Sequence, residues 1–362
     1  MPEFVPGLEL SESFYRDVVK PILDVHYPGL AYAAALIGAG SEVLGYDTEQ
    51  STDHHWGPRV MLFVSKDTYE TLKTPISETL SAKLPYTFRG YSTNFGEPDE
   101  IGVRLMQEIA SGPVNHRVDI ATVRSFFMAH LGFDPHDDIR PADWLTFSEH
   151  QLLCATRGKV FHDGSGELTE VREKVGYYPR DIWLYLLASQ WEKVAQDEAF
   201  VGRCGDVGDA LGSRLVATRL VRHLMRLCFL MERHYAPYAK WFGSAFSRLE
   251  CAHVLSPVLA GVLSAHSWWE RERHLSEAYR IVAEKHNALD ITEPLETEVS
   301  QYHTRPYMVI HGDRFVAAIR RQIRDEAVRN LDPAIGSVNQ FADASDALED
   351  PKLGRKLKIL YE

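Results

Sequence analysis

The fold is decided by the stretch GAGSEVLGYDTEQSTDHHWGPRVMLFV, residues 38–64. This stretch links two short apolar runs, residues 31–37 and 60–64, which are typical of buried strands. Gly40 and Ser41 follow the first run, where a glycine lets the backbone approach an anionic group closely. A strand, a loop and a second strand therefore predict an anion site, and we expect the active site here.

Asp53, His55 and Asp119 are the predicted catalytic and metal-ligating residues. Residues 53 and 55 would point to the same side of an extended strand, roughly 6.5 Å apart. Asp119 lies in the alternating run 116–123, a predicted neighbouring strand. Carboxylates supply the hard oxygen ligands that Mg²⁺ or Mn²⁺ prefers, so the three residues could share one cation.

Each of these residues also has a second interpretation. Asp53 could cap a turn, and Asp119 could face solvent. His55 could be a ligand, a general base or a structural residue. A neutral imidazole serves Mg²⁺ poorly, so His55 weakens the prediction of two-metal catalysis.

Outside this stretch, hydrophobic periodicity predicts further elements of an α+β fold. Asp67 is expected to cap a helix that reaches residue 83. Residues 159–162 are expected to form an edge strand, and residues 213–234 a long helix of a second, helical domain.

Length and composition indicate an ordered protein of two domains. The chain has 362 residues, of which 45% are hydrophobic. It contains no apolar run of eighteen residues, and its first residues lack the pattern of a signal peptide, so we expect a cytoplasmic protein with no membrane partner. The four cysteines lie far apart and predict reduced thiols.

The net charge of −12 is unevenly distributed. Residues 1–150 contain 11 basic and 22 acidic residues, whereas residues 201–250 contain eight basic and four acidic ones. A basic island in an acidic protein fits a local phosphate site better than a nucleic-acid surface, so no nucleic-acid partner is expected.

The basic island contains a stripe, Arg219, Arg222 and Arg226, at helical spacing. The stripe could be a solvated face, or it could meet phosphates. We expect five residues to contact a phosphorylated ligand: Gly40, Ser41, Arg214, Arg222 and Lys240.

In combination, these features resemble the DNA polymerase beta-like nucleotidyltransferase superfamily. The segments GSEVLGYDTEQSTDHHWGPR, YYPRDIW, GDALGSRL and YAPYAKWFGSAF look like a bacterial family of uncharacterised nucleotidyltransferase-fold proteins with a C-terminal helical domain. The resemblance covers most of the chain. It implies an α+β fold in which a small mixed sheet flanked by helices (residues 1–172) precedes an all-α domain (residues 173–362).

The superfamily resemblance also implies an activity: metal-dependent transfer of a nucleoside monophosphate from a nucleoside triphosphate, most simply ATP, to an acceptor hydroxyl. We expect a small-molecule acceptor. A protein acceptor is the first alternative, as in an adenylylating regulator. A nucleotide-binding protein with weakened catalysis is the second, because His55 stands where the superfamily has a second carboxylate.

Overall fold

The computed structural model describes residues 3–100 and 102–362, with the backbone alone at position 53. The chain forms two compact units. The first comprises Met1–Asp138 and Gln151–Gly176, and the second comprises Ile139–His150 and Tyr177–Glu362. The boundary placed at residues 172/173 stays a prediction.

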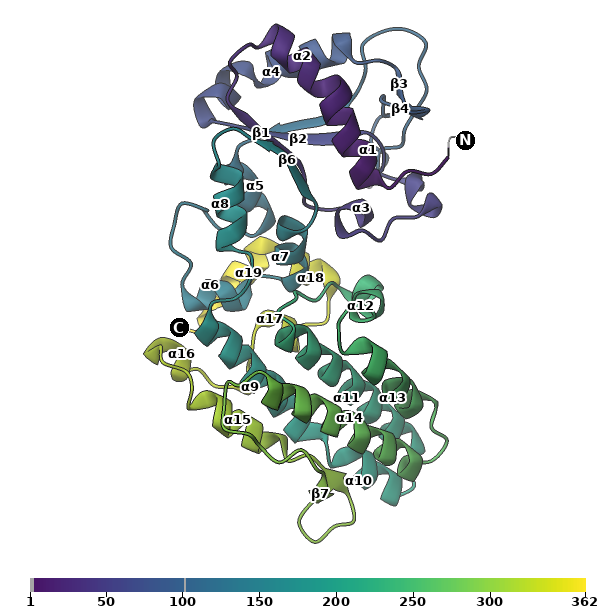
Figure 1. Cartoon of the computed structure of the whole chain (residues 1–362), viewed down its shortest axis with the longest axis vertical. Coiled ribbons are helices and arrows are strands. Elements are labelled where there is room, and N and C mark those ends of the chain that lie inside the picture. The colour runs from purple at the N-terminus through teal and green to yellow at the C-terminus, as the bar shows by residue number, and fades with distance from the viewer. Residues whose placement is uncertain (1–2, 101) are drawn as a thin grey trace. The chain divides into compact units, whose positions relative to one another are not determined.

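A four-stranded mixed sheet forms the centre of the first unit (Figure 1). Its strands, in the spatial order β5, β2, β1, β6, are Arg117–Ala121, Arg59–Val64, Tyr32–Leu36 and Lys159–Asp163. β1 is antiparallel to both neighbours, whereas β2 and β5 are parallel. The α+β class is thus confirmed, and β6 is an edge strand as expected.

The two faces of this sheet differ in chemistry because side chains alternate along a strand. One face is apolar: Val60 and Leu62 of β2 pack with Phe14 and Val19 of the N-terminal helices and Leu80 of α4. The opposite face includes Phe63, whose ring lies 5.7 Å from that of Phe126 in α5. Charged residues of β2 and β5 also lie on this second face.

Helices and a two-stranded sheet complete the first unit. The remaining elements are α1 (Gly7–Phe14), a π-helical turn (Tyr15–Val19), α2 (Lys20–His26), α3 (Ser41–Leu44), a 3₁₀-helix (Glu49–Asp53), α4 (Lys66–Lys83), β3 (Thr87–Phe88), β4 (Tyr91–Ser92), α5 (Val123–His130), α7 (Glu149–Thr156) and α8 (Glu167–Lys174).

The cap of α4 differs from the prediction. The Ser65 side chain accepts the backbone N–H of Thr68, which makes Ser65 the N-cap and leaves Asp67 inside the first turn. The expectation that Asp67 caps this helix is therefore wrong. Ser65 has the extended backbone that an N-cap requires, whereas Asp67 is already helical.

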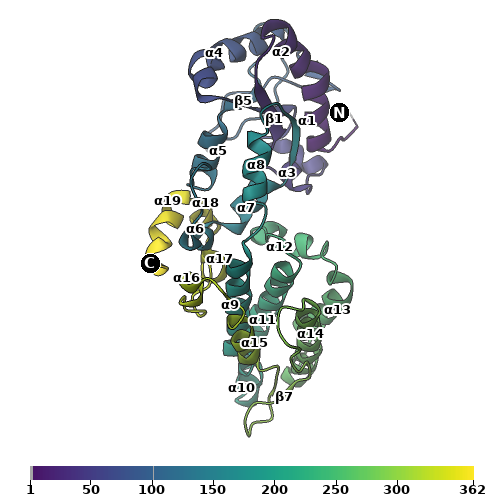
Figure 2. The ribbon, with the colours of Figure 1, turned by 60° about the vertical axis from the view of Figure 1, so that its left-hand side comes forward.

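The second unit is almost entirely helical (Figure 2). Its elements are α6 (Pro141–Thr146), α9 (Arg180–Asp197), α10 (Phe200–Asp206), α11 (Ala210–Met231), α12 (Ala239–Phe246), α13 (Ala252–Ser264), α14 (Trp268–Ala288), the hairpin β7 (Ser300–Gln301) and β8 (Met308–Val309), α15 (Gly312–Arg320), α16 (Glu326–Arg329), α17 (Val338–Phe341), α18 (Ser345–Glu349), α19 (Pro351–Lys356) and a 3₁₀-helix (Leu357–Leu360).

Helix α9 is central to this unit and is buried on several sides. Its Trp191 stacks on Phe315 of α15 with 4.1 Å between ring centroids, and its Trp183 indole donates to the carbonyl of Leu230 in α11 at 2.7 Å. Helix α11 packs in turn against α14. None of the described helices is long and apolar enough to cross a bilayer.

Candidate functional site

Three segments of the predicted site converge at one end of the sheet. β1 is antiparallel to β2, so the carboxyl end of β1 lies beside the amino end of β2, and β5 runs parallel to β2. The turn at Gly40, the loop that leads into β2 and Arg117 at the start of β5 therefore meet at the same edge. The sequence predicted this convergence for β1, β2 and the strand of Asp119, but not for Arg117.

Gly40 occupies a conformation that favours glycine, with φ 148°, directly before α3. A Cβ at this position would lie 2.7–2.8 Å from the carboxylate of Glu42. The buried Glu42 carboxylate forms an ion pair with Arg59, which also donates to the carbonyl of Ala39 at 3.4 Å. The glycine is thus required by the approach of Glu42, and Ser41 opens the helix beside it.

Arg59 and Arg117 are register partners on the parallel strands β2 and β5. Their side chains leave the same face of the sheet, next to each other, because paired residues share a face. Arg59 is 8% exposed, and its Nε is buried without a hydrogen-bond partner among the described residues. Since Glu42 neutralises Arg59, the pair retains the charge of Arg117 and one buried Arg59 donor, and this combination favours an anion.

The ring of His55 contacts Arg117. Its Nδ1 lies 3.2 Å from Nη1 of Arg117. A guanidinium only donates, so Nδ1 is the acceptor and a neutral His55 carries its proton on Nε2. Burial, followed by the charges of Arg117 and Arg59, lowers the pKa of His55. The imidazole is therefore neutral near pH 7, and the lone pair of its Nδ1 accepts the hydrogen bond from Arg117.

The backbone at His55 is also unusual. Its φ is 53°, a left-handed value that non-glycine residues rarely adopt, and its N–H donates to the carbonyl of Arg104 at 3.0 Å. The next residue, Trp56, is buried and donates its indole N–H to Asp47 at 3.0 Å. These contacts hold the loop before β2 in place.

Asp119 lies on the same face as Arg117, two residues further along β5. Its Oδ2 is 3.7 Å from Nη2 of Arg117, and its side chain is 55% exposed. Arg117 thus contacts both His55 and Asp119. The backbone of Asp53 ends a 3₁₀-helix, and His55 has a left-handed φ of 53°. The expectation that residues 53 and 55 lie on one extended strand is therefore wrong, because β2 begins only at Arg59. The side chain of Asp53 lies outside the described residues.

The described residues do not form a closed cation cage: no three His, Cys, Asp or Glu side chains among them are grouped so as to hold a metal. The residues at this end of the sheet fit a Mg²⁺ ion that is held mainly by the phosphates of a ligand and by only one or two protein carboxylates. Asp119 is an accessible carboxylate on this face and would be such a ligand.

The three basic residues predicted to bind nucleotide all lie in the second unit, at different places. Arg222 of α11 lines a pocket and pairs with Asp343 at 2.6 Å. Arg214, near the start of α11, is exposed and is not among the residues that line this pocket. Lys240 of α12 lies 4.9 Å from the ring centroid of Trp241.

Arg117, Glu42 and Lys193 are the residues that sequence reasoning missed. Arg117 could have been found because it precedes Asp119 by two residues on a predicted strand and must share its face. Glu42 follows Ser41 directly, but nothing in the sequence pairs it with Arg59. Lys193 lines a pocket in the second unit, and nothing in the sequence places it opposite the arginine stripe.

Comparisons with known proteins give limited similarity. A model of a domain of unknown function, DUF4037, matches residues 144–242, well under half of the chain. No curated protein matches the sequence. Among solved structures, a nucleotidyltransferase-like protein from Exiguobacterium sibiricum 255-15 is similar, with 12% identity, a TM-score of 0.29 and coverage of 81% of this chain and 82% of that chain. At this TM-score the likeness supports no argument about function.

Proposed function

We propose that this protein is a nucleotidyltransferase that moves a nucleoside monophosphate from a nucleoside triphosphate, with ATP the first choice, to a hydroxyl of a small molecule. The observation that carries the proposal is the convergence of the Gly40–Ser41 turn, the Arg59–Arg117 pair and Asp119 at one end of the sheet. A backbone turn and the Arg117 guanidinium suit a triphosphate, and a carboxylate beside them suits its cation.

Under this proposal, each residue has a defined role. Gly40 and Ser41 would lie against the triphosphate, and Arg117 would neutralise its charge. Asp53 and Asp119 would hold Mg²⁺ or Mn²⁺, which neutralises the triphosphate and lowers the pKa of the acceptor hydroxyl. His55 would orient Arg117 through Nδ1.

A second candidate is nucleotide binding without transfer. It is favoured by one observation: Arg117 lies within 3.2 Å of His55 and 3.7 Å of Asp119, where a cationic group repels a metal ion. Such a protein would act as a sensor or scaffold rather than as an enzyme.

Labelled nucleotides separate the two candidates. The protein is incubated with each α-labelled nucleoside triphosphate and Mg²⁺ or Mn²⁺, with hydroxylated acceptors and with itself as acceptor, and pyrophosphate release, product and self-labelling are measured. Metal-dependent pyrophosphate release supports the transferase, and self-labelling would indicate that the acceptor is a protein. Binding without release supports the second candidate, and absence of binding contradicts both.

Variants locate the activity. Asp53→Asn and Asp119→Asn should each remove pyrophosphate release while the fold is retained. Glu78→Gln is the matched control, because Glu78 is an exposed carboxylate on α4, the helix that covers the apolar face of the sheet. Unchanged activity in both aspartate variants would exclude this end of the sheet as the active site.

A further inference from the structure

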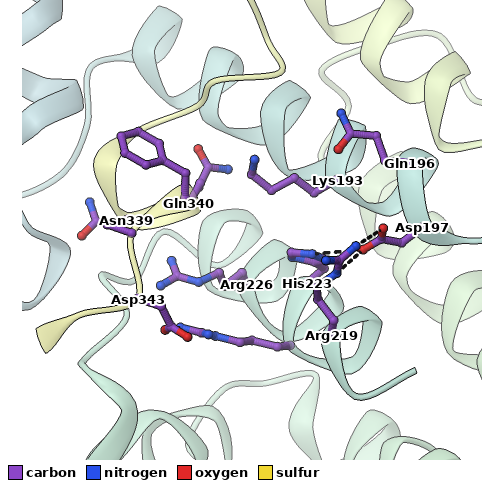
Figure 3. A pocket seen from close by; sticks show the side chains of 12 residues that line it. Lys193, Gln196, Asp197, Arg219, His223, Arg226, Asn339, Gln340 and Asp343 are labelled. Carbon is purple, nitrogen blue, oxygen red and sulfur yellow. Dashed lines mark hydrogen bonds and ion pairs between the residues drawn. The ribbon is translucent and has the colours of Figure 1, made fainter. Parts of the chain in front are cut away.

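A pocket of about 300 Å³ lies within the second unit (Figure 3). Its walls come from α9, α11 and the segment around α17. The lining residues are Lys193, Gln196, Asp197, Arg219, Arg222, His223, Arg226, Asn339, Gln340, Phe341, Ala342 and Asp343. This volume is at the lower end of the range for small-molecule sites, roughly 300–1,000 Å³.

Positive charge exceeds negative charge in this pocket. Lys193, Arg219, Arg222 and Arg226 are cationic, whereas the lining carboxylates are Asp197 and Asp343. The lining histidine, His223, is neutral near pH 7, because burial and the surrounding cations lower its pKa to about 3. Even with every carboxylate ionised, the lining retains an excess of positive charge.

One of the four cations has a structural task. Arg219 donates through two nitrogens to the buried Asp197, and His223 lies 3.7 Å from the same carboxylate. The other ring nitrogen of His223 contacts the amide of Gln190 at 3.0 Å. This network joins α9 to α11, and the Arg219 guanidinium is used by its ion pair with Asp197.

The other three cations make either longer contacts than Arg219 does or a contact with an exposed partner. The ammonium of Lys193 contacts the carbonyl of Ala334 at 3.4 Å, and burial lowers the pKa of this lysine. Arg226 reaches Glu149 at 3.5 Å through a single nitrogen. The partner of Arg222, Asp343, is 73% exposed, and such surface pairs contribute little to stability.

The third wall of the pocket is held by its own hydrogen bonds. The amide of Asn339 bonds to the carbonyl of Phe147 at 2.9 Å and to the N–H of Glu149 at 2.9 Å. The amide of Gln340 donates to the carbonyl of Leu186 and to Gln190. The wall is therefore held by hydrogen bonds within the protein, and the charged donors among the lining residues are ammonium and guanidinium groups.

We propose that this pocket binds a compound with at least two linked phosphoryl groups, held by Lys193, Arg222 and Arg226. The ligand could be a nucleoside polyphosphate, whose base would lie against Phe341, or a free polyphosphate. Phe341 is 45% exposed although it lines the pocket. Three cationic donors on facing helices can neutralise a diphosphate unit, and a planar guanidinium binds two phosphate oxygens at once.

Calorimetric titration tests this proposal in the whole protein without divalent cation. The probes are ATP, inorganic tripolyphosphate, pyrophosphate and orthophosphate. We expect tripolyphosphate and ATP to bind, and orthophosphate to bind at least about tenfold more weakly. Tighter binding of ATP than of tripolyphosphate would identify a nucleotide, and equal binding a polyphosphate. Absence of binding by every diphosphate-containing probe would overturn the proposal.

Two variants of one ion pair distinguish an anion site from a structural link. Arg222→Ala removes a cation and should raise the Kd for tripolyphosphate about tenfold, whereas Asp343→Asn removes a competing carboxylate and should lower it. Both variants break the same contact. If the pair were only structural, the two variants would change binding in the same direction or leave it unchanged, and that result would overturn the proposal.

Further variants control for misfolding and for binding of the probe in the first unit. Lys193→Met keeps the aliphatic packing of the side chain, removes its charge and should also raise Kd about tenfold. Arg273→Ala is the control, because Arg273 is exposed on α14 and does not line the pocket. Arg117→Gln removes the cation that would hold a triphosphate in the first unit, and it should leave tripolyphosphate binding by this pocket intact. This result separates the pocket from the proposed transferase site.

Discussion

At the scale of single residues, the two candidate functions differ in the role that they give to Arg117. It contacts His55 and Asp119, and both contacts are made by donors of one guanidinium. If a triphosphate binds to Arg117 as proposed, it would compete with His55 and Asp119 for this guanidinium and change the hydrogen bonding of the His55 ring.

The link between Arg117 and His55 is testable by titration. Arg117→Gln should raise the pKa of His55, because Arg117 is the largest charge that lowers it, after burial. The measurement is the pH dependence of the His55 ring signals in NMR. Arg124→Gln, an exposed arginine of α5, is the control. A His55 titration that does not move in Arg117→Gln would show that the two groups are not in contact.

Gly40 also allows a sharp test of its conformation. Gly40→Ala should lower the free energy of unfolding by about 1–3 kcal/mol, because the new Cβ meets the Glu42 carboxylate and the backbone favours glycine. Gly112→Ala is the matched control: Gly112 also has positive φ, but no atom lies within 4 Å of its Cβ position. Denaturant unfolding measures both, and equal losses would exclude the contact with Glu42.

At the scale of elements, helix α4 shows how a cap is selected. Ser65 and Asp67 are both common N-cap residues, and only their backbone conformation separates them. We expect Ser65→Ala to cost about 1 kcal/mol of stability, since it removes the acceptor for the Thr68 N–H. Asp67→Ala should cost less, about 0.3–1 kcal/mol from the helix dipole. A larger loss in Asp67→Ala would contradict the assigned cap.

The start of α15 depends on one buried carboxylate. Glu198 accepts the backbone N–H groups of Ile310, His311 and Gly312 at 2.8–3.3 Å. Burial nevertheless raises the pKa of Glu198 to about 7. The folded protein therefore binds this proton more tightly than the unfolded chain, and its stability decreases as the pH rises from about 4.5 to about 7.

A variant isolates this contribution. Glu198→Gln should remove a decrease in unfolding free energy of up to roughly 3 kcal/mol between pH 4.5 and pH 7, since each pKa unit corresponds to about 1.4 kcal/mol. Urea unfolding at pH 5 and pH 8 measures the difference. Glu277→Gln, an exposed glutamate of α14, is the control. An equally steep pH dependence in Glu198→Gln would show that another group is responsible.

At the scale of the whole molecule, charge is unevenly distributed along the chain. The net charge of −12 opposes binding to nucleic acids, although residues 201–250 are basic. We expect no complex with duplex DNA or single-stranded RNA at physiological ionic strength in a mobility-shift assay. A complex in which Arg219, Arg222 and Arg226 are essential would contradict the interpretation of this stripe as part of a small-molecule pocket.

Much of the fold was predictable because its determinants are local. The apolar runs 31–37 and 60–64 form β1 and β2, and residues 116–123 contain β5. The long predicted helix at 213–234 corresponds to α11, Ala210–Met231. Periodicity reports which face of an element is buried, and this information needs only neighbours in the sequence.

The candidate sites were predictable only in part. Gly40 and Ser41 lie where the sequence placed them, at the end of β1. The roles of Asp53, His55 and Asp119 as metal ligands stay predictions. The stripe of arginines in α11 was visible, but its division was not: Arg219 binds Asp197, whereas Arg222 binds Asp343.

The sequence by itself determined the α+β class, the strand–loop–strand around Gly40 and the basic island of residues 201–250, because composition and periodicity act over short distances along the chain. Only the tertiary structure decided which charges meet. Arg117 reaches His55 across 62 residues, and Arg222 reaches Asp343 across 121. Such pairs depend on strand register and helix packing, since these fix the distance between side chains that the sequence leaves far apart.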